Sequence, residues 1–206
     1  SARNKGYMSN AGFVVTGDGV VVYDALGTPV LGEAMIAAIR KVTPQPIRRV
    51  IVSHYHADHI YGLQAFKAVG AEVWAYRKAQ QYLTSTQATE RLAQRRTELF
   101  PWVDEKTVVV PPDLWIDGDT SFRMGGLTFR LVYSEGAHTP EDLMMYVEPD
   151  RLLFAGDLIF AGRVPFVGNA DSAGWLKAMD KMIALKPAVV VPGHGPASRD
   201  VERDLV

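Results

Sequence analysis

Short apolar runs alternate with longer amphipathic segments along the chain, and neither a linker nor a repeat separates them. Apolar runs of four to eight residues bounded by Gly, Pro or Asp are typical of strands, whereas apolar positions three or four apart are typical of helices. The pattern predicts hairpins over 13–24, 122–133 and 143–160, single strands at 50–52, 72–76 and 188–191, and helices over 32–41, 63–69, 77–98 and 172–185. The last residues, 201–206, resemble the beginning of a further helix. This order indicates a mixed α/β protein.

Length and charge narrow the kinds of partner. With 206 residues, of which 48% are hydrophobic, the chain is long enough for one sizeable core, and we expect a single domain over 1–206 whose ends are possible points of truncation. The 22 basic and 23 acidic residues nearly balance, which disfavours binding to nucleic acid or to an anionic membrane. No apolar run approaches the roughly 20 residues that cross a bilayer. A small-molecule substrate is the expected partner, and the oligomeric state stays open.

Residues able to bind a metal ion stand directly after the predicted strands. Five apolar segments lead into Asp24, His54, His138, Asp157 and His194. All five histidines of the chain lie either at these strand ends or within the segment 54–59. One histidine after a strand is more often structural than a ligand, but loops at the ends of packed strands hold several groups in fixed convergence. The distribution therefore favours one shared site.

The segment S-H-Y-H-A-D-H, residues 53–59, concentrates the candidate ligands. In an extended segment residues two apart point the same way, and the bend at 57–58 is expected to turn the later side chains toward a neighbouring ion. The prediction assigns His54, His56 and His138 to one ion, Asp58, His59 and His194 to the other, and Asp157 to both. The chain has no cysteine, and imidazoles with carboxylates suit zinc, iron or manganese. We expect two zinc ions, with iron or manganese as the alternatives.

The candidate ligands belong to four short sequence motifs. The sequence H-x-H-x-D-H at 54–59 is followed by G-A-H-T-P at 136–140, A-G-D at 155–157 and P-G-H-G at 192–195. This series resembles the complete metal-ligand signature of the metallo-β-lactamase superfamily. The resemblance covers nearly the whole chain and implies a four-layer αβ/βα sandwich of two mixed sheets with outer helices and a dinuclear site at one edge. It also implies that Asp24 orients ligands without binding metal itself.

The chain departs from true β-lactamases at the bridging position. One lactamase subclass would need a cysteine where Asp157 stands, and another usually has a serine there. Asp157 instead resembles the bridging aspartate of glyoxalase-type thioesterases. The run from Gly156 to Gly168 is most similar to hydrolases encoded near sulfur-oxidation or quinoprotein genes. Those relatives are often exported, which favours a periplasmic over a cytoplasmic location; residues 1–6 lack the apolar core of an export signal, so we expect any such signal to have been removed.

The predicted function is hydrolysis of a carbonyl substrate. Two ions that share a water lower its pKa and present hydroxide to a carbonyl carbon, and Asp58 is expected to orient that attack. Thioesters, lactones, esters and lactams fit this chemistry. An iron-dependent oxidoreductase of the same fold, similar to persulfide dioxygenases, and a true β-lactamase are the alternatives. A protein that retains metal without turnover is disfavoured by the intact ligand set.

Substrate contacts are weakly specified by the sequence. Arg163 follows Asp157 by six residues and either binds an anionic group of the substrate or lies on the surface. Tyr61 either lines the site or packs against the following helix. Phe160 and Phe166 either form an apolar wall of the site or belong to the core.

Overall fold

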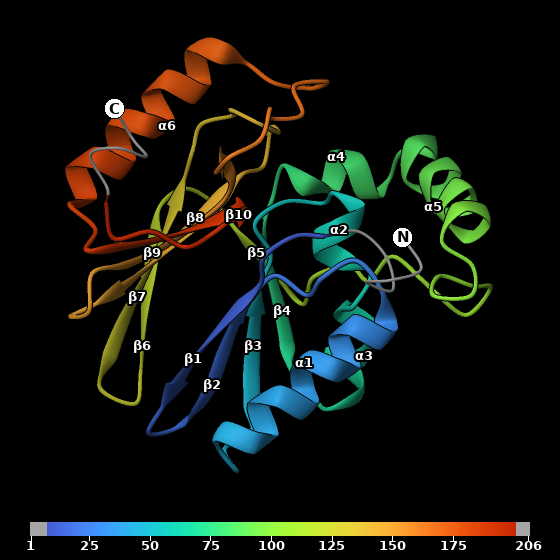
Figure 1. Ribbon diagram of the computed structural model, residues 1–206, viewed down its shortest axis with the longest axis horizontal. Coiled ribbons are helices and arrows are strands. Elements are labelled where there is room, and N and C mark those ends of the chain that lie inside the picture. Colours follow the sequence, from blue (N-terminus) through green and yellow to red (C-terminus); the bar gives the residue numbers. More distant parts are fainter. Residues whose placement is uncertain (1–7, 201–206) are drawn as a thin grey trace.

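Residues 8–200 are described by a computed structural model, in which ten strands and six helices form a layered α/β domain (Figure 1). The elements are β1 (Gly12–Thr16), β2 (Gly19–Tyr23), α1 (Pro29–Val42), β3 (Ile47–Ile51), α2 (Ala57–Ile60), α3 (Leu63–Ala68), β4 (Glu72–Tyr76), α4 (Ala79–Leu83), α5 (Thr86–Glu98), β5 (Leu114–Ile116), β6 (Thr120–Met124), β7 (Leu127–Tyr133), β8 (Leu143–Glu148), β9 (Leu152–Phe160), α6 (Ser172–Leu185) and β10 (Val189–His194). The C-terminal helix predicted over 201–206 lies outside the described residues.

The strands form two five-stranded sheets. The first has the order β1-β2-β3-β4-β5, with an antiparallel β1–β2 hairpin followed by parallel pairs. The second has the order β10-β9-β8-β7-β6, in which only β10 and β9 are parallel. Both sheets are therefore mixed, and each half of the chain contributes one of them.

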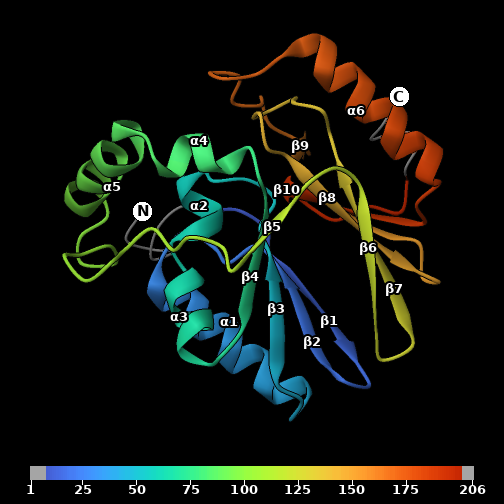
Figure 2. The same cartoon turned by 180° about the vertical axis from the view of Figure 1, so that it is seen from behind.

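Three separate apolar clusters show how the layers are held together. One lies between the first sheet and the helices α1 and α3, a second lies between the second sheet and α6, and the third joins the two sheets. Figure 2 shows the same layers from behind, with α6 outside one sheet and α1 and α3 outside the other. The predicted four-layer αβ/βα sandwich is confirmed.

Side-chain alternation in β2 explains why the sequence of this strand is a continuous apolar run. Val20 and Val22 pack against the helices, whereas Val21 and Tyr23 face the second sheet. Successive residues of a strand point to opposite faces, so a strand covered on both sides needs apolar residues throughout. The hairpins over 13–24, 122–133 and 143–160, and the strand at 72–76, are found at or close to the predicted bounds.

Helix α1 begins three residues before the predicted start at Gly32. Thr28 is its N-cap, because the hydroxyl accepts a hydrogen bond from the backbone N–H of Leu31, and Pro29 follows at the first helical position. Both residues are favoured there, since a capping oxygen satisfies an otherwise unpaired N–H and proline has none to lose. The prediction was wrong here because it followed the apolar face rather than the cap.

The helix predicted over 77–98 is broken into α4 and α5. Thr84 and Ser85 lie at the break, where each hydroxyl donates a hydrogen bond to a backbone carbonyl of α4. Such local bonds compete with helical hydrogen bonds and favour helix ends. Ser85 takes an extended conformation and starts α5 in a new direction. The short strand β5 was not predicted, because three residues carry too little periodicity to distinguish a strand from a loop.

No helix within residues 8–200 combines the length and the apolar character needed to cross a bilayer.

Candidate metal centre

The predicted ligands converge from both sheets at one end of the sandwich. His54 and His56 follow β3, Asp58 and His59 lie in α2, and His138 follows β7. His194 is the last residue of β10. Asp157 departs from the prediction of a strand end: it lies inside β9, which continues to Phe160. Pairing between β9 and β10 is irregular near Asp157, because the register shifts on both sides of Pro192.

Two groups of side chains each bring their ligand atoms within 4.8 Å of one another. The first consists of His54, His56, His138 and Asp157, and the second of Asp58, His59 and His194. In the first group, Nε2 of His138 lies 3.0 Å from Nδ1 of His56. In the second, Nε2 of His194 lies 3.3 Å from Oδ2 of Asp58. The structure therefore brings together all seven residues that were predicted to bind metal.

The two carboxylate oxygens of Asp157 face different groups. Oδ2 lies 3.4 Å from Nε2 of His138 and 3.7 Å from Nε2 of His54. Oδ1 lies 3.2 Å from Nε2 of His59 and 3.3 Å from Nε2 of His194. Asp157 thus stands between the two groups, with one oxygen directed toward each.

Asp24 and Ser53 support the cluster through hydrogen bonds to two of its histidines. Asp24 is completely buried, and its Oδ2 lies 2.7 Å from Nδ1 of His59. The Ser53 hydroxyl is 2.8 Å from the same oxygen and 2.9 Å from Nδ1 of His54. A carboxylate only accepts hydrogen bonds, so the Ser53 hydroxyl donates to Asp24 and accepts from Nδ1–H of His54. Both imidazoles then carry their proton on Nδ1, which leaves Nε2 of each available to an ion.

Unpaired polar atoms test whether a cation fits this cluster. Within residues 8–200, Nε2 of His54, Nε2 of His59 and Oδ1 of Asp157 are buried and have no hydrogen-bond partner. Buried polar atoms are nearly always paired, because an unpaired one carries its full desolvation cost. Each of the three atoms lies within 3.7 Å of another candidate ligand atom of the centre. Imidazole nitrogen and carboxylate oxygen are ligands that zinc takes. The residues present therefore fit a bound metal.

The two groups differ in their electrostatics. Burial, followed by the neighbouring histidines, lowers the pKa of His56 to about 3, and burial also lowers the pKa of His54 and of His138. Burial acts in the same direction on His59 and His194, but Asp157 and Asp58 outweigh it, raising the pKa of His59 well above its usual value and that of His194 to about 9. The carboxylates of the centre thus stabilise positive charge beside them, which a metal ion would supply when bound.

The backbone of Gly193 lies close to Asp157, and this close approach gives a first prediction. A Cβ atom on Gly193 would lie 2.0 Å from Oδ1 of Asp157, 2.7 Å from the backbone carbon of Gly156 and 2.8 Å from the backbone nitrogen of Asp157, so Gly193→Ala must displace both the carboxylate and the backbone of β9. We expect the variant to lose stability and to bind metal about tenfold or more weakly, as when a metal's supporting residues are damaged. Titration with zinc in the presence of a competing chelator measures this. Affinity equal to that of the unaltered protein would show that the position of the carboxylate does not govern metal binding.

A cavity of about 210 Å³ opens onto the centre. Its walls include Phe160, Phe166 and Arg163. The Phe160 ring stacks on His194 with centroids 4.9 Å apart, and the Phe166 ring lies edge-on to His56 at 5.8 Å. Nη1 of Arg163 is 3.2 Å from Nδ1 of His194. Tyr61 does not line this cavity. It is fully buried in the apolar cluster beside α1 and α3, which agrees with the second of the two predicted alternatives, packing against the following helix.

Sequence reasoning missed four residues of this region. Ser53 precedes the histidine cluster, and its place between an acidic residue and a histidine is visible only in the fold. Trp175 of α6 lies edge-on to His138, with ring centroids 5.7 Å apart. Arg91 and Arg95 come from α5 and line the cavity, although more than thirty residues separate them from the 54–59 segment. Their spacing of four residues on a polar helix was a usable signal, because it places both on one face.

Comparison with known proteins identifies the family. The family model of the metallo-beta-lactamase superfamily matches residues 4–194. A linear primary-alkylsulfatase from a Pseudomonas species is 24% identical over 86% of this chain and 40% of its own length. A type 2 metallo-beta-lactamase from a Bacillus species is 25% identical over 91% of this chain and 66% of its own. The chain thus spans less than two thirds of the length of both of these curated relatives.

Solved structures agree with the observed layers. A metallo-beta-lactamase from Pontibacter korlensis superposes with a TM-score of 0.74 at 25% identity, over 96% of this chain and 83% of that one. The sec-alkylsulfatase Pisa1 from a Pseudomonas species superposes with a TM-score of 0.73 at 18% identity, over 94% of this chain and 36% of that one, which shows the fold alone. With a family model that matches nearly the whole chain and a fold that agrees, the chain belongs to the metallo-β-lactamase superfamily.

Proposed function

We propose that this protein is a dinuclear metal-dependent hydrolase, with zinc as the metal, that cleaves a carbonyl substrate such as a thioester, lactone, ester or lactam. The observation that carries the proposal is the position of Asp157, whose Oδ1 and Oδ2 face two separate groups of imidazoles. A carboxylate so placed suits a bridge between two ions. The family's named relatives, β-lactamases and alkylsulfatases, are hydrolases and support the reaction type.

His54, His56 and His138 would hold one ion, Asp58, His59 and His194 the other, and Asp157 both. When bound, two zinc ions supply a nucleophile from water at neutral pH and stabilise the negative charge that develops on a carbonyl oxygen. The other roles belong to the chain's own residues. Ser53 and Asp24 hold the His54 and His59 rings in the tautomer with free Nε2 atoms.

Asp58 is the residue proposed to orient the attack on the substrate. Its side chain reaches the cavity and is only 20% exposed, and Oδ2 lies within 3.6 Å of Nε2 of His59. Burial opposes ionisation of this carboxyl, but the adjacent His59 and His194 outweigh burial and lower its pKa. An ionised carboxylate at neutral pH accepts a hydrogen bond from a water molecule and so orients its lone pair toward a substrate.

A panel of substrates tests the proposal. Protein reconstituted with zinc is assayed against a thioester, a lactone, a carboxylic ester and a cephalosporin, beside metal-free protein and the variant Asp58→Asn. We expect turnover of at least one carbonyl substrate, loss of turnover without metal, and a large loss in the variant. Protein that binds zinc but cleaves none of these substrates would contradict the proposal. Preferential cleavage of the cephalosporin would support the β-lactamase alternative. Iron-dependent oxygen consumption with a persulfide would support the oxidoreductase alternative.

Sulfate esters are a second candidate substrate class. Alkylsulfatases occur among both the sequence relatives and the structural neighbours, and three arginines line the cavity at the centre. A guanidinium binds sulfate oxygens through two parallel N–H donors, which suits an anionic reacting group. An alkyl sulfate in the same panel separates the two classes.

Arg163 gives a prediction about substrate charge. Nη1 of Arg163 lies 3.2 Å from Nδ1 of His194, so the guanidinium stands at the edge of the metal centre. A guanidinium binds carboxylate and sulfonate groups through two parallel N–H donors, so Arg163 is placed to bind an anionic group of a substrate. Arg163→Ala should then raise KM for anionic substrates about tenfold or more and leave neutral analogues nearly unchanged, a difference of roughly 1.4 kcal/mol or more. Equal losses for both, measured by steady-state kinetics, would mean that Arg163 only supports its loop.

A further inference from the structure

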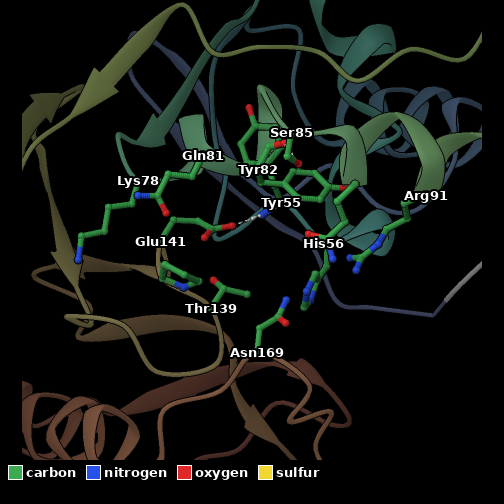
Figure 3. Close-up of a pocket in the computed structure, with 12 residues that line it drawn as sticks. Tyr55, His56, Lys78, Gln81, Tyr82, Ser85, Arg91, Thr139, Glu141 and Asn169 are labelled. Carbon is green, nitrogen blue, oxygen red and sulfur yellow. Dashed lines mark hydrogen bonds between the residues drawn. The ribbon is translucent and has the colours of Figure 1, made fainter.

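A second cavity of about 410 Å³ adjoins the metal centre (Figure 3). His56 and Arg91 line both this cavity and the smaller one at the centre, so the two spaces meet at these side chains. Sites for small molecules commonly enclose about 300–1,000 Å³. The 210 Å³ at the centre accommodates a reacting group, and the larger cavity provides room for the rest of a substrate.

Arg91 is the cation at the junction of the two spaces. Its side chain is half-buried, and its Cζ lies 5.6 Å from the centroid of the Tyr82 ring. Among residues 8–200 no carboxylate lies within ion-pair distance of it, whereas its neighbours on α5 are engaged: Arg95 pairs with Glu98, and Arg96 donates to the backbone carbonyls of Asp104 and Thr107. A half-buried guanidinium without an anionic partner is suited to an anion supplied by a ligand.

Most of the other wall residues of the larger cavity are polar, and Tyr55, Tyr82 and Pro140 add apolar surface. Figure 3 shows Lys78 at the end opposite Arg91, with the side chains of Gln81, Ser85, Thr139 and Asn169 between them. Glu141 is the cavity's single acidic wall residue among those described; it is buried, and its Oε1 accepts a hydrogen bond of 3.2 Å from the backbone N–H of Tyr55. Burial also raises the pKa of Glu141. The cavity therefore offers two cationic side chains and several hydrogen-bonding groups, with one buried carboxyl in its wall.

We propose that this cavity is a second substrate subsite, which binds a polar portion of the substrate carrying a carboxylate, sulfonate or phosphate group through Arg91. The inference rests on the proposed hydrolase function in one respect, namely that the scissile bond lies at the metal centre beside His56. It assigns α5 to substrate selection. It differs from the prediction for Arg163, which lines only the smaller of these two cavities.

Binding to metal-free protein tests the subsite without any turnover. The probe is benzenesulfonate, with benzamide as its neutral counterpart, followed by heteronuclear NMR of the side-chain amides of Gln81 and Asn169 and of Nε–H of Arg91. Benzenesulfonate should shift these signals saturably, and Arg91→Gln should weaken this binding about tenfold or more. Arg91→Lys, which keeps the charge, should restore part of it. Arg40→Gln, an exposed arginine on α1, serves as the matched control and should bind as the unaltered protein does.

Kinetics on the zinc-loaded protein supply the second arm. For a matched pair of substrates that differ in an anionic group away from the scissile bond, Arg91→Gln should raise KM for the anionic member about tenfold and leave kcat within about twofold. Undiminished binding of benzenesulfonate to Arg91→Gln, or equal binding of benzamide, would overturn the subsite. Absence of turnover with an intact binding difference would instead overturn the hydrolase function and leave the subsite standing, so the two failures are distinguishable.

Discussion

Replacement of Asp157 by asparagine should remove at least one metal ion and lower turnover at least ten- to a hundredfold. The carboxylate presents one oxygen to the His54 and His138 side and the other to the His59 and His194 side. An amide retains one carbonyl oxygen and replaces the second with an N–H donor, which cannot bind a cation. One of the two groups therefore loses a ligand while the shape of the residue is preserved.

Metal content after dialysis, measured by inductively coupled plasma mass spectrometry, and steady-state rates report the effect of Asp157→Asn. The matched control is Asp180→Asn on the exposed side of α6, which should change neither quantity. Unchanged metal content together with an unchanged rate would show that Asp157 serves only the packing of β9 against β10.

Replacement of Asp24 by alanine should weaken metal binding ten- to a hundredfold and also destabilise the metal-free protein. This carboxylate accepts hydrogen bonds from the backbone N–H and the hydroxyl of Ser53, and from Nδ1–H of His59. Alanine leaves these buried donors without a partner, and each unsatisfied buried group costs about 1–3 kcal/mol. The free energy of unfolding should therefore fall by about 2–4 kcal/mol even without metal.

Urea unfolding of the metal-free protein and zinc titration of the folded protein measure the two effects of Asp24→Ala separately. Asp24→Asn, which keeps one acceptor, should lie between alanine and the unaltered protein in both measurements. A variant that is destabilised but binds zinc with full affinity would contradict the orienting role and reduce Asp24 to a structural residue.

The metal centre was accessible to sequence analysis because its residues are few, of unusual type and tied to strand ends. Every histidine of the chain lies in the 54–59 segment or is one of the isolated His138 and His194. No other histidine could therefore be assigned to the site. The layered fold followed from the same alternation of apolar runs and helical patterns. Strand β2, with five buried residues in succession, has the composition of a strand covered on both faces.

Other features depended on tertiary contacts that no local pattern encodes. The break between α4 and α5 arises from two hydroxyl-to-carbonyl bonds, and three-residue β5 exists because β4 offers it a parallel partner. The spacing of Arg91 and Arg95 places both on one face of a polar helix, but only the fold shows that this face borders the metal centre. The sequence left two alternatives for Tyr61, a wall of the site or packing in the core, and its complete burial shows that it belongs to the core.

The number of ions per chain tests the central claim most directly. Native mass spectrometry of protein titrated with zinc measures it without a substrate and without assuming a reaction. Seven ligand residues in two groups joined by Asp157 predict saturation at two zinc ions per chain, with a single ion as an intermediate of the titration. Saturation at one tightly bound ion, with the second group of residues still free of metal, would contradict the dinuclear centre.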